Sequence, residues 1–354
     1  MAGAPRRALL AAAALAPAAA SIAARAQGRE VRDAAGRAVV LPRPVRRVFA
    51  AGPPASILLW SAAPDLLAGW PGRPPRPAEL AFMAPEAAAL PEVGRLTGRD
   101  NTANVEAVLA HRPDLVLDYG SVGPTYVSLA DRVRGQTGLP VLLLDGRLPR
   151  IPETYRLLGD ILDRRGAAEE RATAADRVLA EAEGAAAALR ARGRPRVLYV
   201  RGPRGQETGF AGSINTEIIE FVGAENVAAG GLGTGGLAPL SPEQALAWEP
   251  DWVIGIHPDF PDHARTDPVW RSLRAVRDGR LALAPSLPYG WVDFPPSVNR
   301  LLGLAWLPVL FGARRAEGLA ATVSDLYALL FHRRPEPSRV EALLRPALPR
   351  HGRG

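Results

Sequence analysis

The chain has 354 residues, more than a single core usually supports, which favours two domains. It contains neither lysine nor cysteine, which excludes Schiff-base chemistry, a phosphate-loop lysine, disulfides, thiolate metal sites and a lipid-bearing N-terminal cysteine. Its formal net charge of +7 comes without a basic stripe, so we expect no nucleic-acid partner.

Residues 1–26 have the order of a secretory signal peptide. A pair of arginines precedes an Ala/Leu stretch, and small residues stand at Ala24 and Ala26. The apolar stretch is too short to span a bilayer as a helix. We therefore expect export to the periplasm and cleavage after Ala26, with N-terminal sequencing of the exported protein as the test. The arginine pair leaves the general and the twin-arginine export routes both open.

Residues 27–165 predict an N-terminal α/β lobe. Short apolar runs alternate there with helix-like segments, which is typical of parallel strands joined by helices. The expected strands are Val48–Ala51, Leu115–Asp118 and Val141–Asp145. A loop of Gly, Pro or Ser follows each of them. Because ligands bind at the carboxyl ends of strands in open parallel sheets, we expect these loops to form a binding rim.

Residues 166–193 predict a single long helix. Ala, Glu and Arg dominate this segment, no proline interrupts it, and its apolar side chains recur at helical spacing. A helix of about 25 residues extends about 37 Å. The segment is either one more surface helix or a connector between two lobes, and we expect the connector.

Residues 194–354 predict a second α/β lobe with C-terminal helices and strands at Val197–Val200 and Trp252–Ile256. Residues 241–251 repeat the pattern of residues 104–114. Both segments have Glu at the third position, Leu-Ala at the sixth and seventh, and Pro-Asp at the end, directly before an apolar strand. The repetition favours duplicated lobes.

With these segments, the chain resembles the periplasmic binding proteins of ATP-binding cassette (ABC) importers for ferric siderophores, haem and cobalamin. The resemblance covers essentially all of the mature chain, and its most specific pieces are the two repeated segments and residues 290–300, Gly-Trp-Val-Asp-Phe-Pro-Pro-Ser-Val-Asn-Arg. It implies two Rossmann-like lobes with parallel sheets, joined by one connector helix, with a ligand cleft between them. We expect a monomer that is not an enzyme and has no cofactor.

The resemblance also implies a membrane partner. In such proteins an exposed Glu on each lobe pairs with arginines of the transmembrane permease, and these positions match Glu106 and Glu243. A carboxylate at the start of a helix is also favoured by the helix dipole or by capping. That alternative accounts for either residue alone, whereas their matching places in two lobes favour docking.

Polar candidates for ligand binding stand at the expected strand ends. The backbone N–H groups of Ala55 and Ser56 open a helix and suit an oxyanion or the acidic edge of a chelate, with a tight structural turn as the equal alternative. Arg201 follows a strand, and its guanidinium suits carboxylates and oxyanions unless it is an ordinary surface arginine. Tyr119 and Ser121 add hydroxyl groups from the first lobe.

The remaining candidates are a histidine and three aromatic residues. His257 follows the last expected strand and either contacts a chelate or is an ordinary loop residue. Trp70, Tyr289 and Trp291 lie in Gly/Pro-rich loops, where they either form an apolar wall for a planar ligand or pack into the core. No set of metal-ligating side chains is expected.

The ligand class follows from the resemblance. A chelated metal of the ferric siderophore, haem or corrinoid type comes first, and a molybdate or tungstate oxyanion or a nickel complex is the alternative. An exported hydrolase is the weaker alternative, because the chain has no His-Glu-x-x-His, Gly-x-Ser-x-Gly or phosphate-loop motif.

Overall fold

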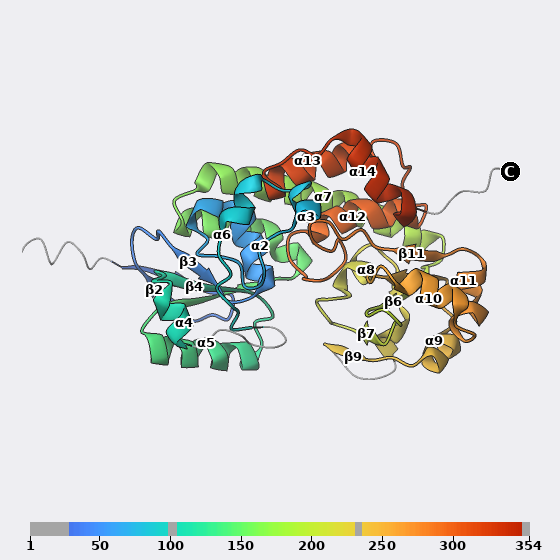
Figure 1. The fold of residues 1–354 in the computed structure, drawn as a ribbon, viewed down its shortest axis with the longest axis horizontal. Helices are drawn as coiled ribbons and strands as arrows, with labels where there is room; N and C mark the ends of the chain where they lie inside the picture. The colour runs from blue at the N-terminus through green and yellow to red at the C-terminus, as the bar shows by residue number, and fades with distance from the viewer. Residues whose placement is uncertain (1–27, 98–104, 231–235, 349–354) are drawn as a thin grey trace, which may run out of the picture.

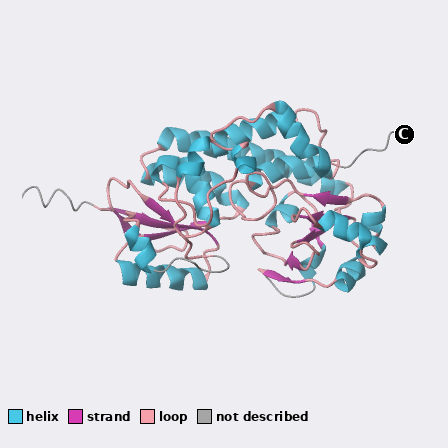
Figure 2. Cartoon of the chain, in the orientation of Figure 1, coloured by secondary structure: helices cyan, strands magenta, loops and turns pink. Residues whose placement is uncertain are grey.

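The structure is a computed structural model that describes residues 28–97, 105–230 and 236–348. The expected signal peptide lies outside these residues. Two sheets lie at opposite ends of the molecule, with long helices crossing one side of both (Figure 1). Strands are confined to the two ends and helices cover the side between them (Figure 2).

The first sheet is three-stranded and parallel in the order β3-β4-β5. Its strands are β3 (Val48–Ala50), β4 (Leu115–Gly120) and β5 (Val141–Asp145). β4 is longer than predicted because its last residues, Tyr119 and Gly120, continue the pairing with β5. An antiparallel pair, β1 (Arg29–Arg32) and β2 (Ala38–Leu41), precedes this sheet in the chain.

The second sheet is four-stranded and parallel in the order β11-β10-β6-β8. Its strands are β6 (Arg196–Val200), β8 (Glu225–Asn226), β10 (Trp252–Gly255) and β11 (Leu281–Leu283). A small antiparallel pair of β7 (Glu207–Gly209) and β9 (Leu237–Pro239) stands beside it. The predicted fold class, α/β with two parallel sheets, is confirmed.

One long helix, α7 (Arg165–Ala191), runs between the two sheets in the chain. It packs against α6 and α12 and buries small side chains such as Ala172, Ala175 and Ala182 in the main core. The predicted connector is therefore a helix. The other helices are α2 (Pro53–Ala62), α3 (Pro77–Leu80), α4 (Val105–Ala110), α5 (Pro124–Thr137), α6 (Ile151–Ile161), α8 (Glu217–Phe221), α9 (Pro242–Trp248), α10 (Phe260–Thr266), α11 (Arg274–Arg277), α12 (Arg300–Leu310), α13 (Leu319–Phe331) and α14 (Pro337–Leu344).

The repeated Pro-Asp pair has the same structural role in both lobes. The Asp114 carboxylate accepts the Arg47 backbone N–H at 2.9 Å, and the Asp114 N–H donates to the Arg47 carbonyl at 2.8 Å. Asp251 makes the same two bonds with Arg196, at 3.0 and 2.7 Å. Each aspartate thereby joins the starts of two neighbouring strands.

The backbone before each Pro-Asp pair is also the same. Arg112 and Glu249, which precede the two prolines, have left-handed φ angles of 46° and 44°. Such angles are uncommon for residues other than glycine. Their recurrence places α4 and α9 at equivalent positions before β4 and β10. None of the described helices has both the length and the hydropathy to cross a membrane.

Candidate functional site

Arg201 stands directly after β6, where its backbone N–H donates to the Glu207 carbonyl at 2.8 Å. Its side chain is only 11% exposed. The Nε atom lies 3.5 Å from the Asp293 carboxylate, and Nη1 lies 3.9 Å from that of Glu207. A single positive charge therefore faces two carboxylates in a nearly solvent-free position.

Asp293 is fully buried and is held from three sides. The Tyr199 hydroxyl donates to Oδ2 at 2.5 Å, and the Asn215 side-chain amide donates to Oδ1 at 2.8 Å. Burial, followed by the Asp293 charge, raises the pKa of Tyr199 well above its ordinary value, so the phenol stays protonated and donates. With the Arg201 ion pair, the carboxylate is compensated inside the protein.

The ring of Phe294 lies beside the Arg201 end of this network. Its side chain is 65% exposed, and the centre of its ring lies 5.5 Å from the Arg201 guanidinium carbon. Its φ of 66° lies in the left-handed region, which is strained for an aromatic residue. A strained backbone persists only where the surrounding structure holds it in place, and such residues are frequent at binding sites. An exposed apolar ring thus stands over the arginine that the sequence predicted as a ligand contact.

The first-lobe candidates differ in accessibility. Ser121 is exposed after β4, whereas Tyr119 is 1% exposed and belongs to the main core. The Tyr119 hydroxyl has no hydrogen-bond partner among the described residues, and burial raises its pKa. Tyr119 therefore offers no surface to a ligand in this conformation.

The predicted anion donors at the start of α2 are enclosed by the protein. Ala55 and Ser56 are buried, and the Ser56 N–H donates to the Gly52 carbonyl at 3.1 Å. The Ser297 hydroxyl donates to the Pro54 carbonyl at 2.7 Å, so the chain from the second lobe lies against this helix start. Between an anion site and a tight structural turn, the geometry of this helix start fits the structural turn.

The aromatic wall is packed in the core. Trp291 has no exposed surface, and its indole N–H donates to the Tyr327 hydroxyl of α13 at 3.1 Å. Trp70 donates to the Ala87 carbonyl at 2.8 Å, and the ring of the half-buried Tyr289 lies 6.5 Å from its own. These residues do not form an open ligand-facing wall here. Tyr327 and Phe331 of α13 pack against Trp291 and Tyr289. Trp70 is buried between Trp60 and Tyr289.

His257 lies at the same sheet edge as Arg201, since β10 and β6 are neighbours with Gly255 opposite Val200. Its side chain is 38% exposed, and its Nδ1 accepts the Asp259 backbone N–H at 3.2 Å. The described residues contain no group of three or more His, Cys, Asp or Glu that could hold a metal ion.

Asp118 is a buried carboxyl group that the sequence reasoning missed. It lies within β4, is 7% exposed, and accepts bonds from the Tyr119 N–H at 3.0 Å and the Thr97 hydroxyl at 3.3 Å. Burial raises its pKa from 3.8 to about 6, against the lowering effect of these two bonds. The available signal was an acidic residue inside an apolar strand.

We expect Asp118→Asn to remove a pH dependence of stability. Because the folded chain holds this proton more tightly than the unfolded chain, the stabilisation is fully present below about pH 4 and is lost as pH rises through about 6; it amounts to about 2 to 3 kcal/mol. Urea unfolding between pH 4 and 7 measures it as the wild-type free energy minus that of the variant. Asp278→Asn, at an exposed carboxylate, is the control. A constant difference across the range contradicts the prediction.

Arg300 is a second residue that the sequence reasoning did not identify. It is fully buried, and it donates to the Gly146 carbonyl after β5 at 2.5 Å and to the Ile214 carbonyl at 2.9 Å. It also donates to the Glu217 carboxylate at 3.1 Å, which in turn accepts the Leu148 N–H at 3.2 Å. The arginine thereby ties the end of a first-sheet strand to the start of α8.

Glu106 and Glu243 are both exposed in the first turns of α4 and α9. The α9 cap is made by Ser241 and Gln244, whose side chains each bond the other's backbone N–H. Glu243 is therefore not needed for capping, and neither glutamate has an ion pair with a described residue. The two helices lie on the side of the molecule away from α7 (Figure 1).

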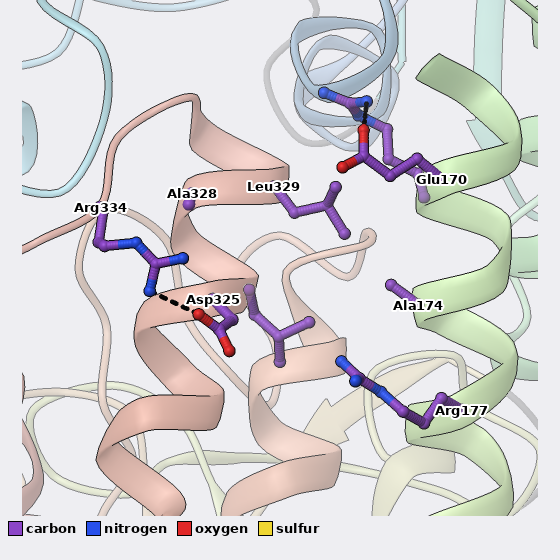
Figure 3. Close-up of a pocket in the computed structure, with 9 residues that line it drawn as sticks. Glu170, Ala174, Arg177, Asp325, Ala328, Leu329 and Arg334 are labelled. Atoms are coloured by element: carbon purple, nitrogen blue, oxygen red, sulfur yellow. Dashed lines mark hydrogen bonds and ion pairs between the residues drawn. The ribbon is translucent and has the colours of Figure 1, made fainter. Parts of the chain in front are cut away.

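A cavity of about 350 Å³ lies between α7 and α13, away from the strand ends. Arg334 and Asp325 form an ion pair at 2.5 Å on one side, while Arg177 reaches from α7 on the other (Figure 3). Its walls also include Ala174 and Leu329. Because parallel-sheet proteins bind ligands at strand ends, we do not assign the ligand to this cavity.

The sequence matches the family model for "Periplasmic binding protein" over residues 84–287. No curated protein matches it. Among solved structures, an ABC transporter solute binding protein from Sulfurospirillum deleyianum has a TM-score of 0.79 at 24% identity, covering 90% of this chain and 99% of that chain.

Two further structures carry ligands. The molybdate periplasmic binding protein of Haemophilus influenzae, solved with molybdate, has a TM-score of 0.69 at 20% identity and covers 87% of this chain and 99% of its own. CeuE of Helicobacter pylori, solved as a Ni-His complex, has a TM-score of 0.68 at 16% identity and covers 89% and 99%. At these identities the likeness shows the shared fold alone.

Proposed function

The chain belongs to the periplasmic binding protein family, and we propose that the solute it captures is a metal chelate of the ferric siderophore, haem or corrinoid type. Members of this family are solute-binding components of ABC importers, not enzymes, and they work with a membrane permease. We further propose that residues 1–26 direct export and that the ligand lies between the two lobes, at the carboxyl ends of the strands.

The charge balance around Arg201 is the observation that favours a chelate over an oxyanion. One guanidinium faces the carboxylates of Asp293 and Glu207, so this corner of the site has no net positive charge to offer an anion. A free tetrahedral oxyanion needs positive charge that no internal carboxylate balances. Nη1 of Arg201 has no hydrogen-bond partner among the described residues, but the charge of the guanidinium is already balanced by its two carboxylate neighbours. The exposed ring of Phe294 instead suits the apolar body of a chelate or macrocycle.

We retain three of the sequence candidates as proposed ligand contacts and add one. Arg201, Ser121 and His257 stay because they lie at strand ends. Phe294 takes the place of the aromatic candidates, which are buried at Trp70 and Trp291 and half-buried at Tyr289. Glu106 and Glu243 are proposed to dock the protein onto the permease.

Calorimetric titration tests the ligand class. The panel consists of ferric hydroxamate and catecholate chelates, haem, cobalamin, nickel with histidine, and molybdate. We expect tight binding of a ferric chelate, haem or cobalamin and no response to molybdate. Tight molybdate or nickel-histidine binding without a response to the others would reverse the order of the two proposals.

Phe294→Ala is expected to weaken binding of the chelate that responds by about tenfold, because it removes apolar contact area at the site. The melting temperature should change little, since the ring is mostly exposed. Val40→Ala removes an exposed apolar side chain elsewhere and should leave the titration unchanged. Equal affinities for wild type and Phe294→Ala reject the proposed contact.

A further inference from the structure

Large apolar side chains are seldom exposed among the described residues. Those that are exposed are Val40 at 57%, Leu109 at 42%, Leu246 at 42% and Phe294 at 65%. Leu109 and Leu246 stand at the same position of the repeated segment. Single exposed apolar residues need no explanation, but equal exposure at matched positions of two lobes does.

Both leucines share a helix face with a docking glutamate. Leu109 comes three residues after Glu106, and Leu246 three residues after Glu243, so each pair lies on neighbouring turns of one face. The intervening residues, Val108 in α4 and Ala245 in α9, are fully buried and anchor the opposite face. The two helices therefore present the same acidic and apolar pair to solvent.

The position of these pairs points to a common partner. Each of the two helices precedes a parallel strand and runs in the direction opposite to that strand. The first turn of the helix therefore lies at the edge of the sheet where the strands end. α4 and α9 both lie on the side away from α7 (Figure 1). Two equivalent patches on one side of a duplicated protein match a partner built from two equivalent subunits.

We propose that Leu109 and Leu246 form the apolar half of the permease docking surface, each entering an apolar pocket beside the cationic group that receives the neighbouring glutamate. The partner is the two-fold membrane permease, because each patch combines one negative charge with one exposed leucine. This inference rests on the proposed function and names further contacts of the same docking step.

Docking of fluorescently labelled protein to nanodiscs that carry the cognate importer tests the inference without any ligand. Leu109→Gln and Leu246→Gln keep side-chain length and helix propensity but remove the apolar contact. Each should weaken docking by about threefold to tenfold, and the double variant by about tenfold to a hundredfold. Val40→Thr is the matched exposed control and should dock as wild type.

Melting temperatures equal to that of the wild type establish that the variants are folded. A double leucine variant that docks as wild type, beside a Glu106→Arg/Glu243→Arg variant that does not dock, overturns the apolar contact alone. If the charge-reversed variant also docks normally, the proposed docking face itself is wrong.

Discussion

Replacing Arg300 by alanine is expected to lower the free energy of unfolding by about 3 to 5 kcal/mol. The side chain is fully buried, and its removal leaves the Glu217 carboxylate and the carbonyls of Gly146 and Ile214 without their donor. A buried acceptor that loses its partner keeps the full cost of its desolvation. Urea unfolding at pH 7 measures the loss.

A surface arginine with a similar ion pair is the control. Arg334 bonds Asp325 at 2.5 Å, but both side chains are more than half exposed, so Arg334→Ala should cost less than about 1 kcal/mol. Glu217→Gln keeps the shape at Arg300 and should fall between the two. A loss at Arg300 no larger than that at Arg334 would show that Arg300 does not hold the two lobes together.

Reversing both charges in Glu106→Arg/Glu243→Arg is expected to weaken docking to the importer by a hundredfold or more. One charge-assisted contact contributes about 1.5 to 3 kcal/mol, and the two sites are far enough apart for their losses to add. Both side chains are exposed and pair with no described residue, so folding and ligand affinity should hardly change. The nanodisc assay measures docking, and calorimetric titration measures ligand affinity.

Glu183→Arg is the matched control for charge reversal. Glu183 is exposed on α7, the side of the molecule away from α4 and α9. This variant should dock as wild type, and higher salt should weaken docking of the wild type because the contacts are ionic. Intact docking of the double variant rejects the assignment of these glutamates. Lost ligand binding would instead place them in the ligand site.

The three strands of the first sheet and the central strands β6 and β10 of the second could be predicted from the sequence because their signals are local, whereas the short edge strands β8 and β11 were not predicted. An apolar run between loop residues specifies a buried strand wherever the rest of the chain lies, and β5 has the predicted bounds. The repeated Pro-Asp pair was also visible in the sequence, and Asp114 and Asp251 each stand directly before the strand that they help to align. The connector helix followed from uninterrupted helical periodicity.

Burial of the site residues could not be predicted in this way. Trp291 and Trp70 lie in loops and were expected to face a ligand, yet both are buried, Trp291 against Tyr327 of α13 and Trp70 against Trp60 of α2. The amide of Ser56 read as an open donor, yet the helix itself uses it. The partners of Arg201 include Asp293, which is distant in sequence, and only the fold brings the two charged groups within 3.5 Å of each other.

The sequence by itself therefore determined the α/β class, the duplicated strand starts, the connector helix and the matched glutamates, all of which depend on spacing along a short segment. Only the tertiary structure decided which arginine forms ion pairs with internal carboxylates, which aromatic ring is exposed and that Arg300 joins the lobes. These properties depend on contacts such as that of Arg300 with Gly146, 154 residues apart, for which no local pattern carries a signal.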